Sequence, residues 1–98
     1  VNVGGNKMQE EYVILPRSFT NTKAYRDTYS LWTFTYLLFN CDNDGHLELN
    51  IRNLDLPISE NKFKASLKKL YDEGLIYGDT QGNHREIYIS DYQEKYAE

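Results

Sequence analysis

Apolar residues recur at helical spacing in the second half of the chain. Phe63, Leu67 and Leu70 stand at i, i+4 and i+7, which places them on one buried stripe, while lysines occupy the other side. Ser59 suits the N-cap position of a helix, and Gly74 suits the left-handed residue that ends one. The pattern therefore predicts a helix that begins after Ser59 and ends at Gly74.

Alternating apolar and polar residues predict three strands around this helix. The segments LIYGD and REIYISD follow it, and Gly82 and Asn83 between them tolerate the positive φ of a hairpin turn. A third alternating segment, residues 46–51, precedes it. Between that strand and the helix, RNLDLP predicts a short helical turn that Pro57 stops.

The segment SLWTFTYLLFN, residues 30–40, fits two patterns. Its first half alternates aromatic residues with threonines, as a strand would, and propensity alone favours a strand. Its second half, YLLF, is apolar on every side, as a fully buried central helix would be. We expect a helix because of a family resemblance described below, and we expect Trp32 and Phe39 to lie in the core.

The segment NCDNDGHLELNI begins like a calcium-binding EF-hand loop. Asn40, Asp42 and Asp44 stand at alternate positions and Gly45 is sixth. Position 12, which should hold a bidentate glutamate, is Ile51, and a strand pattern replaces the second helix. Since Asn, Asp and Gly also favour tight turns, the segment predicts a turn and no metal site.

Length and composition indicate one small domain. We expect residues 1–7 to be a flexible leader or a cloning remnant, and residues 8–98 to form a single domain. The one cysteine, Cys41, excludes an internal disulfide and suits a reducing compartment. No apolar run is long enough to span a membrane and no signal peptide is visible, so we expect a cytoplasmic protein without membrane contact.

Motifs for catalysis are absent from the sequence. It shows no Gly-rich phosphate loop, nucleophile elbow or paired catalytic carboxylates, so we expect neither an enzyme nor a cofactor. His46 and His84 have no acidic or cysteine partner near them that would complete a metal site, and with Cys41 they are too scattered for zinc. They are interpreted as surface histidines.

Charge is unevenly distributed along the chain, whose net charge is −4. Residues 52–70 carry five basic residues against two acidic ones, and residues 72–98 carry seven acidic residues against two basic ones. A basic segment inside an acidic chain indicates either a local anionic partner or a solvated helix face.

Three stretches together resemble a known family. YVILPRSF, AYRDTYSLWTFTYLLFNCDNDGHLELNIRNL and SENKFKASLKKLYDEGLI are similar to the N-terminal winged-helix domain of phage and plasmid replication initiators and replisome organisers. The resemblance covers about residues 12–92. It implies an α+β fold that is mainly α, a winged helix-turn-helix with a short three-stranded antiparallel wing sheet. The ending LKKLYDEGLI is shared by winged helices of many functions.

The resemblance also implies binding of double-stranded DNA. The second helix of such a motif enters the major groove, which on this chain makes Asn61 a base contact and Lys62, Lys64 and Lys68 phosphate contacts. At the wing, Arg85 and its neighbour His84 would reach the minor groove or the backbone. The implied role is that of a phage or plasmid type replication or regulatory protein.

Protein binding is the alternative function. Glu60 opposes phosphate at the start of the predicted helix, and the acidic C-terminal part would repel DNA. A small acidic winged-helix protein of a mobile element could instead bind and modulate a host protein, such as a nucleic-acid enzyme, through its acidic or tyrosine-rich surface. The tail also predicts a homodimer, because Tyr92 and Tyr96 form an apolar stripe at i, i+4.

Overall fold

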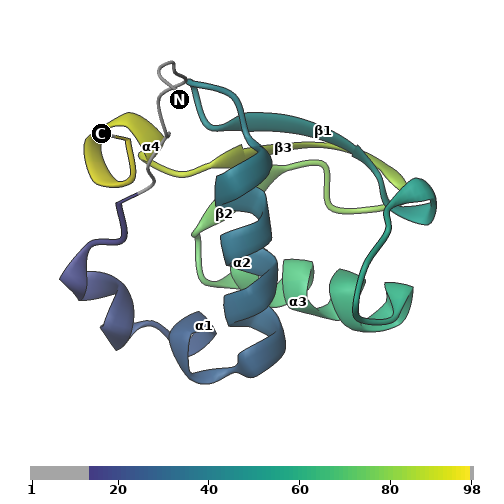
Figure 1. The fold of residues 1–98 in the computed structure, drawn as a ribbon, viewed down its shortest axis with the longest axis horizontal. Helices are drawn as coiled ribbons and strands as arrows, with labels where there is room; N and C mark the ends of the chain where they lie inside the picture. The colour runs from purple at the N-terminus through teal and green to yellow at the C-terminus, as the bar shows by residue number, and fades with distance from the viewer. Residues whose placement is uncertain (1–13, 98) are drawn as a thin grey trace, which may run out of the picture.

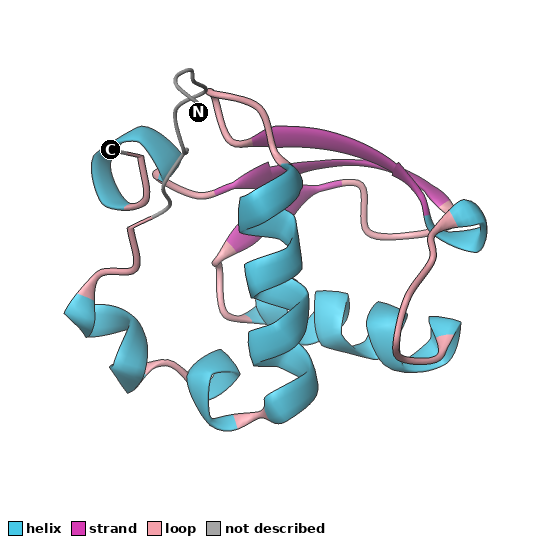
Figure 2. Cartoon of the chain, in the orientation of Figure 1, coloured by secondary structure: helices cyan, strands magenta, loops and turns pink. Residues whose placement is uncertain are grey.

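The computed structural model describes residues 14–97, which form an α+β domain (Figure 1). Three strands make one antiparallel sheet in the order β1-β3-β2. The helices α2 and α3 cover one face of this sheet, and the core lies between them (Figure 2). The elements in chain order are η1 (Arg17–Asn21), α1 (Lys23–Arg26), α2 (Thr28–Asn40), β1 (His46–Asn50), η2 (Ile51–Asn53), α3 (Glu60–Asp72), β2 (Ile76–Gly78), β3 (His84–Ile89) and α4 (Tyr92–Lys95).

The ambiguous segment is a helix, as expected. Asp27 caps α2 by accepting a hydrogen bond from the backbone N–H of Ser30, and Phe34, Leu37 and Leu38 are buried. The expectation that Phe39 lies in the core is wrong, because its side chain is 69% exposed. The helix is therefore buried on one side and presents aromatic residues on another.

The predicted helix around residues 60–72 is confirmed as α3. The side chain of Ser59 accepts a hydrogen bond from the backbone N–H of Lys62, and Gly74 has φ +76°. Phe63 and Leu67, on the predicted stripe, are fully buried. Burial of this stripe against α2 and the sheet fixes which side of α3 faces outward.

The segment that begins like a calcium loop is a turn followed by strand β1. Gly45 has φ +80°, and a carboxylate oxygen of Asp42 accepts hydrogen bonds from the backbone N–H groups of Asp44 and His46. Ile51, at the position of the missing glutamate, is 1% exposed and belongs to the core. The predicted turn and strand are confirmed.

The hairpin between β2 and β3 also matches the sequence pattern. Gly82 has φ +84° in the connection, and β3 pairs with both other strands. The short helical turn expected from RNLDLP is a single 3-10 turn, η2, which begins at Ile51 and ends at Asn53, before the expected stop at Pro57. It is much shorter than α3.

The C-terminal tyrosines pack on the domain itself. Tyr96 is 3% exposed and meets Phe34 edge to face at 5.6 Å between ring centroids, and Tyr92 is half-buried beside it. These residues do not present the free apolar stripe on which the predicted C-terminal dimer rested. Residues 1–7, the predicted leader, lie outside the described residues. No helix within residues 14–97 has the length and apolar character needed to cross a membrane.

Candidate nucleic-acid interface

The outward face of α3 carries three of the four predicted contact residues of this helix. Asn61, Lys62 and Lys68 are exposed, and Lys64 is partly exposed. Asn61, Lys64 and Lys68 lie opposite the buried stripe, because residues three and four positions apart share a helix face. Lys62 lies on the side toward α2, with its ammonium group over the Tyr29 ring. Asn61, Lys64 and Lys68 are therefore available to a partner that approaches α3 from outside.

A groove of about 500 Å³ runs between α3 and the β2–β3 hairpin. It brings together Lys64, Lys68 and Arg85, three of the five predicted contact residues, whereas Asn61 and Lys62 lie outside its lining. Polar hairpin side chains form the opposite wall. The complete lining is Lys64, Ala65, Lys68, Tyr71, Asp72, Thr80, Gln81 and Arg85.

Arg85 is a structural residue of this groove. Its side chain lies on the inner face of β3, is 5% exposed, and donates a hydrogen bond from Nε to the backbone oxygen of Gly82 at 2.8 Å. It also lies beside Tyr71, whose pKa is raised chiefly by burial. The expected reach of Arg85 into the minor groove is not compatible with this position. Arg85 stands two and four residues before Ile87 and Ile89, and such positions of a strand share one face. The sequence could therefore have predicted that this side chain points inward.

Each lysine predicted to hold phosphate has a neighbour within the domain. Lys64 pairs with Glu60 at 3.2 Å, and Lys68 pairs with Asp72 at 3.0 Å. The ammonium group of Lys62 lies 4.6 Å from the ring centroid of Tyr29. The Lys68 pair is largely exposed, with side chains 76% and 66% accessible. Such pairs contribute about 0–1 kcal/mol, so a phosphate group can replace the carboxylate.

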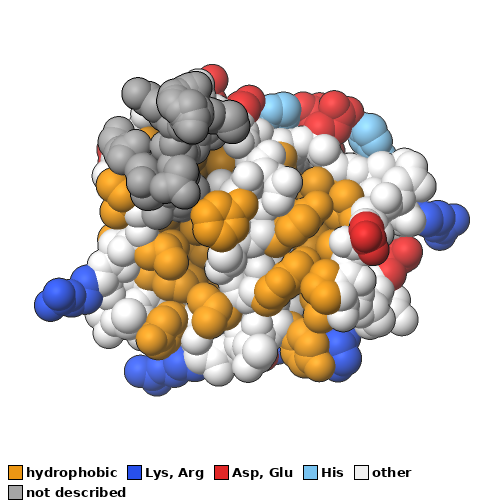
Figure 3. Space-filling view, in the orientation of Figure 1, with side chains coloured by type: hydrophobic (Ala, Val, Ile, Leu, Met, Phe, Trp, Pro, Cys, Tyr) orange, Lys and Arg blue, Asp and Glu red, His pale blue; other side chains and the backbone are white. Residues whose placement is uncertain are grey.

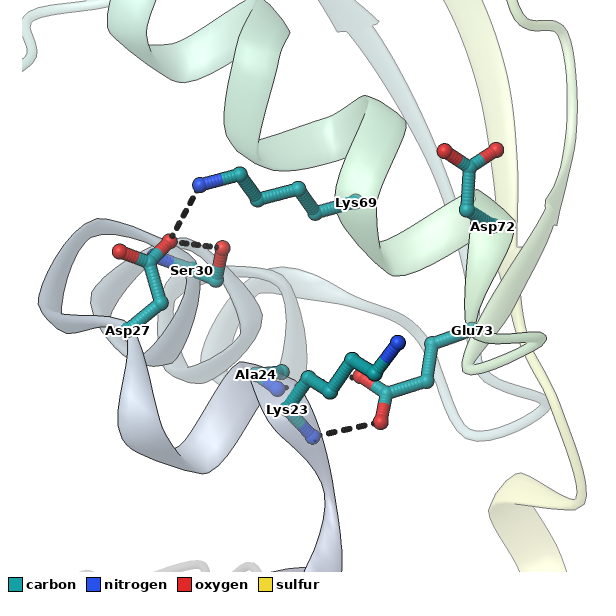
Figure 4. Close-up of a pocket in the computed structure, with 7 residues that line it drawn as sticks. All are labelled: Lys23, Ala24, Asp27, Ser30, Lys69, Asp72 and Glu73. Carbon is teal, nitrogen blue, oxygen red and sulfur yellow. Dashed lines mark hydrogen bonds and ion pairs between the residues drawn. The ribbon is translucent and has the colours of Figure 1, made fainter.

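A second pocket, of about 420 Å³, lies between α1, α2 and α3 (Figure 4). Glu73 caps α1 there by accepting hydrogen bonds from the backbone N–H groups of Lys23 and Ala24, at 2.6 and 3.0 Å. Lys69 pairs with Asp27 at 3.3 Å. The Ser30 hydroxyl donates to Asp27, and this bond is the main cause of the lowered pKa of that carboxyl. These groups fasten the helices to one another.

The outer face of the sheet is acidic and aromatic. Glu48 and Glu86 stand directly opposite each other on β1 and β3. His84 pairs with Glu48 at 2.7 Å, and His46 pairs with Glu86 at 3.0 Å, so both histidines have acidic partners that the sequence did not reveal. Within the described part of the chain, no three His, Cys, Asp or Glu side chains are grouped to hold a metal ion.

Comparisons with models of protein families, with curated proteins and with solved structures find no match to this chain.

Proposed function

We propose that this chain is a winged-helix module that binds double-stranded DNA, with α3 as the recognition helix and the β2–β3 hairpin as the wing. The observation that carries the proposal is the groove between these two elements, where Lys64 and Lys68 project from α3 beside the hairpin. The sheet order β1-β3-β2, with α3 between β1 and β2 in the chain, supports it. The role in phage or plasmid replication or regulation is part of the proposal.

The proposed contacts divide by chemistry. Lys62, Lys64 and Lys68 hold phosphates by exchanging their present neighbours for phosphate oxygens. Asn61, in the first turn of α3, contacts a base edge, for which its amide suits adenine. Arg85 positions the wing from within the domain and makes no DNA contact.

The helix that normally precedes a recognition helix is reduced to η2, three residues long. In this chain α2 supplies the support instead, because Phe63 on α3 is fully buried and meets Tyr36 of α2 edge to face. The proposed recognition helix therefore rests on a buried helix–helix contact, which favours precise placement in a groove.

Charge reversal in the groove tests the proposal. We expect Lys64→Glu with Lys68→Glu to weaken binding to a random duplex by about tenfold or more at low salt, measured by fluorescence anisotropy. The matched control is Arg17→Glu with Lys95→Glu, which changes the net charge equally at exposed sites away from α3. Equal loss of affinity in both variants would show a general charge effect and contradict the proposal.

Binding to a host protein is the second candidate, and the outer sheet face favours it. This face combines Glu48 and Glu86 with Tyr77 and Tyr88, whose rings stack at 5.1 Å between centroids. Acidic and aromatic groups together suit a basic protein surface rather than phosphate. Absence of duplex affinity at low salt would remove the first candidate and leave this one.

A further inference from the structure

Four aromatic side chains form a stripe along α2. Tyr29, Trp32, Tyr36 and Phe39 follow one another at spacings of three, four and three residues, the spacing that keeps side chains on one face in paired helices. We call them the aromatic stripe. Phe39 is 69% exposed and Tyr29 is 41% exposed, while Trp32 and Tyr36 are partly buried and stack at 5.4 Å between centroids.

The stripe belongs to a larger apolar face. Hydrophobic side chains gather on the side of the molecule where α2 lies nearest the viewer, and most charged side chains lie at the rim (Figure 3). Leu54, Leu56 and Ile58 of the segment before α3 are partly buried and also pack against the core. Contiguous exposed apolar surface with a polar rim is typical of a protein interface.

We infer that the aromatic stripe is the interface of a symmetric homodimer in which two α2 helices cross antiparallel. The first argument is the spacing of the four aromatic residues, which is symmetric about position 34. Antiparallel pairing therefore places Tyr29 against Phe39 of the second copy, and Trp32 against Tyr36. A two-fold interface requires this self-complementarity. The contact spans about 15 Å along the helix.

Charge at the two ends of the stripe is the second argument. Basic Arg26 and Lys62 lie at the N-terminal end, where the Lys62 ammonium group sits over the Tyr29 ring. The one acidic residue there, the N-cap Asp27, is paired with Lys69. Acidic Asp42 and Asp44 directly follow the C-terminal end. In an antiparallel pair the basic end of each copy meets the acidic end of the other. A parallel pair would bring like charges together, which is unfavourable.

Dimerisation through this surface does not depend on DNA binding. The stripe and the α3–hairpin groove share no residue, and Lys62 is the one proposed phosphate contact that also lies at an end of the stripe. The dimer is therefore tested on the protein alone, by the mass of the full chain in solution.

The first experiment measures mass by light scattering from low to high micromolar concentration. We expect the wild type to approach twice the 11.6 kDa of one chain and to return toward the monomer on dilution. Phe39→Asp should weaken the dimer by about tenfold or more, since it buries a charge at the interface. Tyr77→Asp, at a 57% exposed tyrosine on the sheet, should dimerise like the wild type.

The second experiment tests the orientation. Lys62→Glu and Asp44→Lys should each weaken the dimer, and combining them should restore most of the affinity, as a coupled pair requires. A wild type that stays monomeric at high micromolar concentration overturns the inference and leaves the stripe to another partner. A Phe39→Asp dimer of unchanged strength also overturns it. Lack of rescue in the double variant overturns the antiparallel arrangement.

Discussion

Gly45 illustrates how one residue holds two distant parts of the chain together. Its φ is +80°, and a Cβ placed there would lie 2.5 Å from the Cβ of Tyr92. Gly82 has a similar φ of +84° but no neighbour within 4 Å of such a Cβ. The first glycine is therefore required by both backbone conformation and packing, and the second by conformation alone.

This difference gives a prediction at Gly45. Both Gly45→Ala and Gly82→Ala should cost about 1–2 kcal/mol for the left-handed backbone. Gly45→Ala should cost more than its control, because Tyr92 and the start of α4 must move. Urea denaturation of the two variants measures the difference. Equal destabilisation would show that the close approach of Tyr92 contributes nothing.

Asp27 should make the stability of the domain depend on pH in the acid range. The Ser30 hydroxyl, and after it Lys69, lower the pKa of this carboxyl. Its stabilising contribution is therefore complete above the unfolded pKa of about 3.9 and is lost as pH falls through the lower folded value. Asp27→Asn keeps a capping side chain but removes the charge. We expect the variant to be less stable than wild type at pH 7 and the difference to shrink near pH 2, by denaturant titration at both pH values. A difference in stability of the same size at both pH values would refute the role of the charge.

At the scale of elements, the packing of α2 against α3 forms a large part of the core. Leu67 lies in this packing and is 0% exposed. Leu67→Ala should cost about 2–5 kcal/mol, whereas Phe39→Ala, at an exposed position, should cost less than about 0.5 kcal/mol in dilute protein. Thermal denaturation checks both. A small destabilisation at Leu67 would mean that α3 is rotated from the observed position.

Local signals explain which elements the sequence could predict. The cap at Ser59, the apolar stripe and Gly74 lie within or directly beside α3, so its position and its outward face could be predicted. The segment 30–40 could not be assigned from propensity, because its helix is stabilised by packing against α3 and the sheet. The exposure of Phe39 depends on where that helix packs, which no local pattern contains.

The candidate site shows the same division. The pairs Lys64–Glu60 and Lys68–Asp72 are four residues apart on one helix, so their formation could have been predicted from spacing. Lys69–Asp27 joins residues 42 positions apart, and the two His–Glu pairs depend on strand register. Those interactions could be found only after the fold was known.

At the scale of the whole molecule, charge is arranged so that two faces differ. The net charge is −4, yet the surface of α3 carries Lys62, Lys64 and Lys68, whereas the outer sheet face carries Glu48 and Glu86. Under the proposed function, the field of DNA would orient the domain with α3 toward the duplex before contact. Binding of a DNA duplex should therefore be weak overall and strongly dependent on the salt concentration.

The salt dependence of duplex binding is the most direct test of the proposed function. We expect log K to fall linearly with log salt. In the variant with Lys62, Lys64 and Lys68 all changed to Ala, the slope should be shallower by about 0.9 for each phosphate that is no longer neutralised. Anisotropy titrations of wild type and variant at several salt concentrations give both slopes. A wild type without affinity at low salt, or a variant with an unchanged slope, would contradict DNA binding through α3.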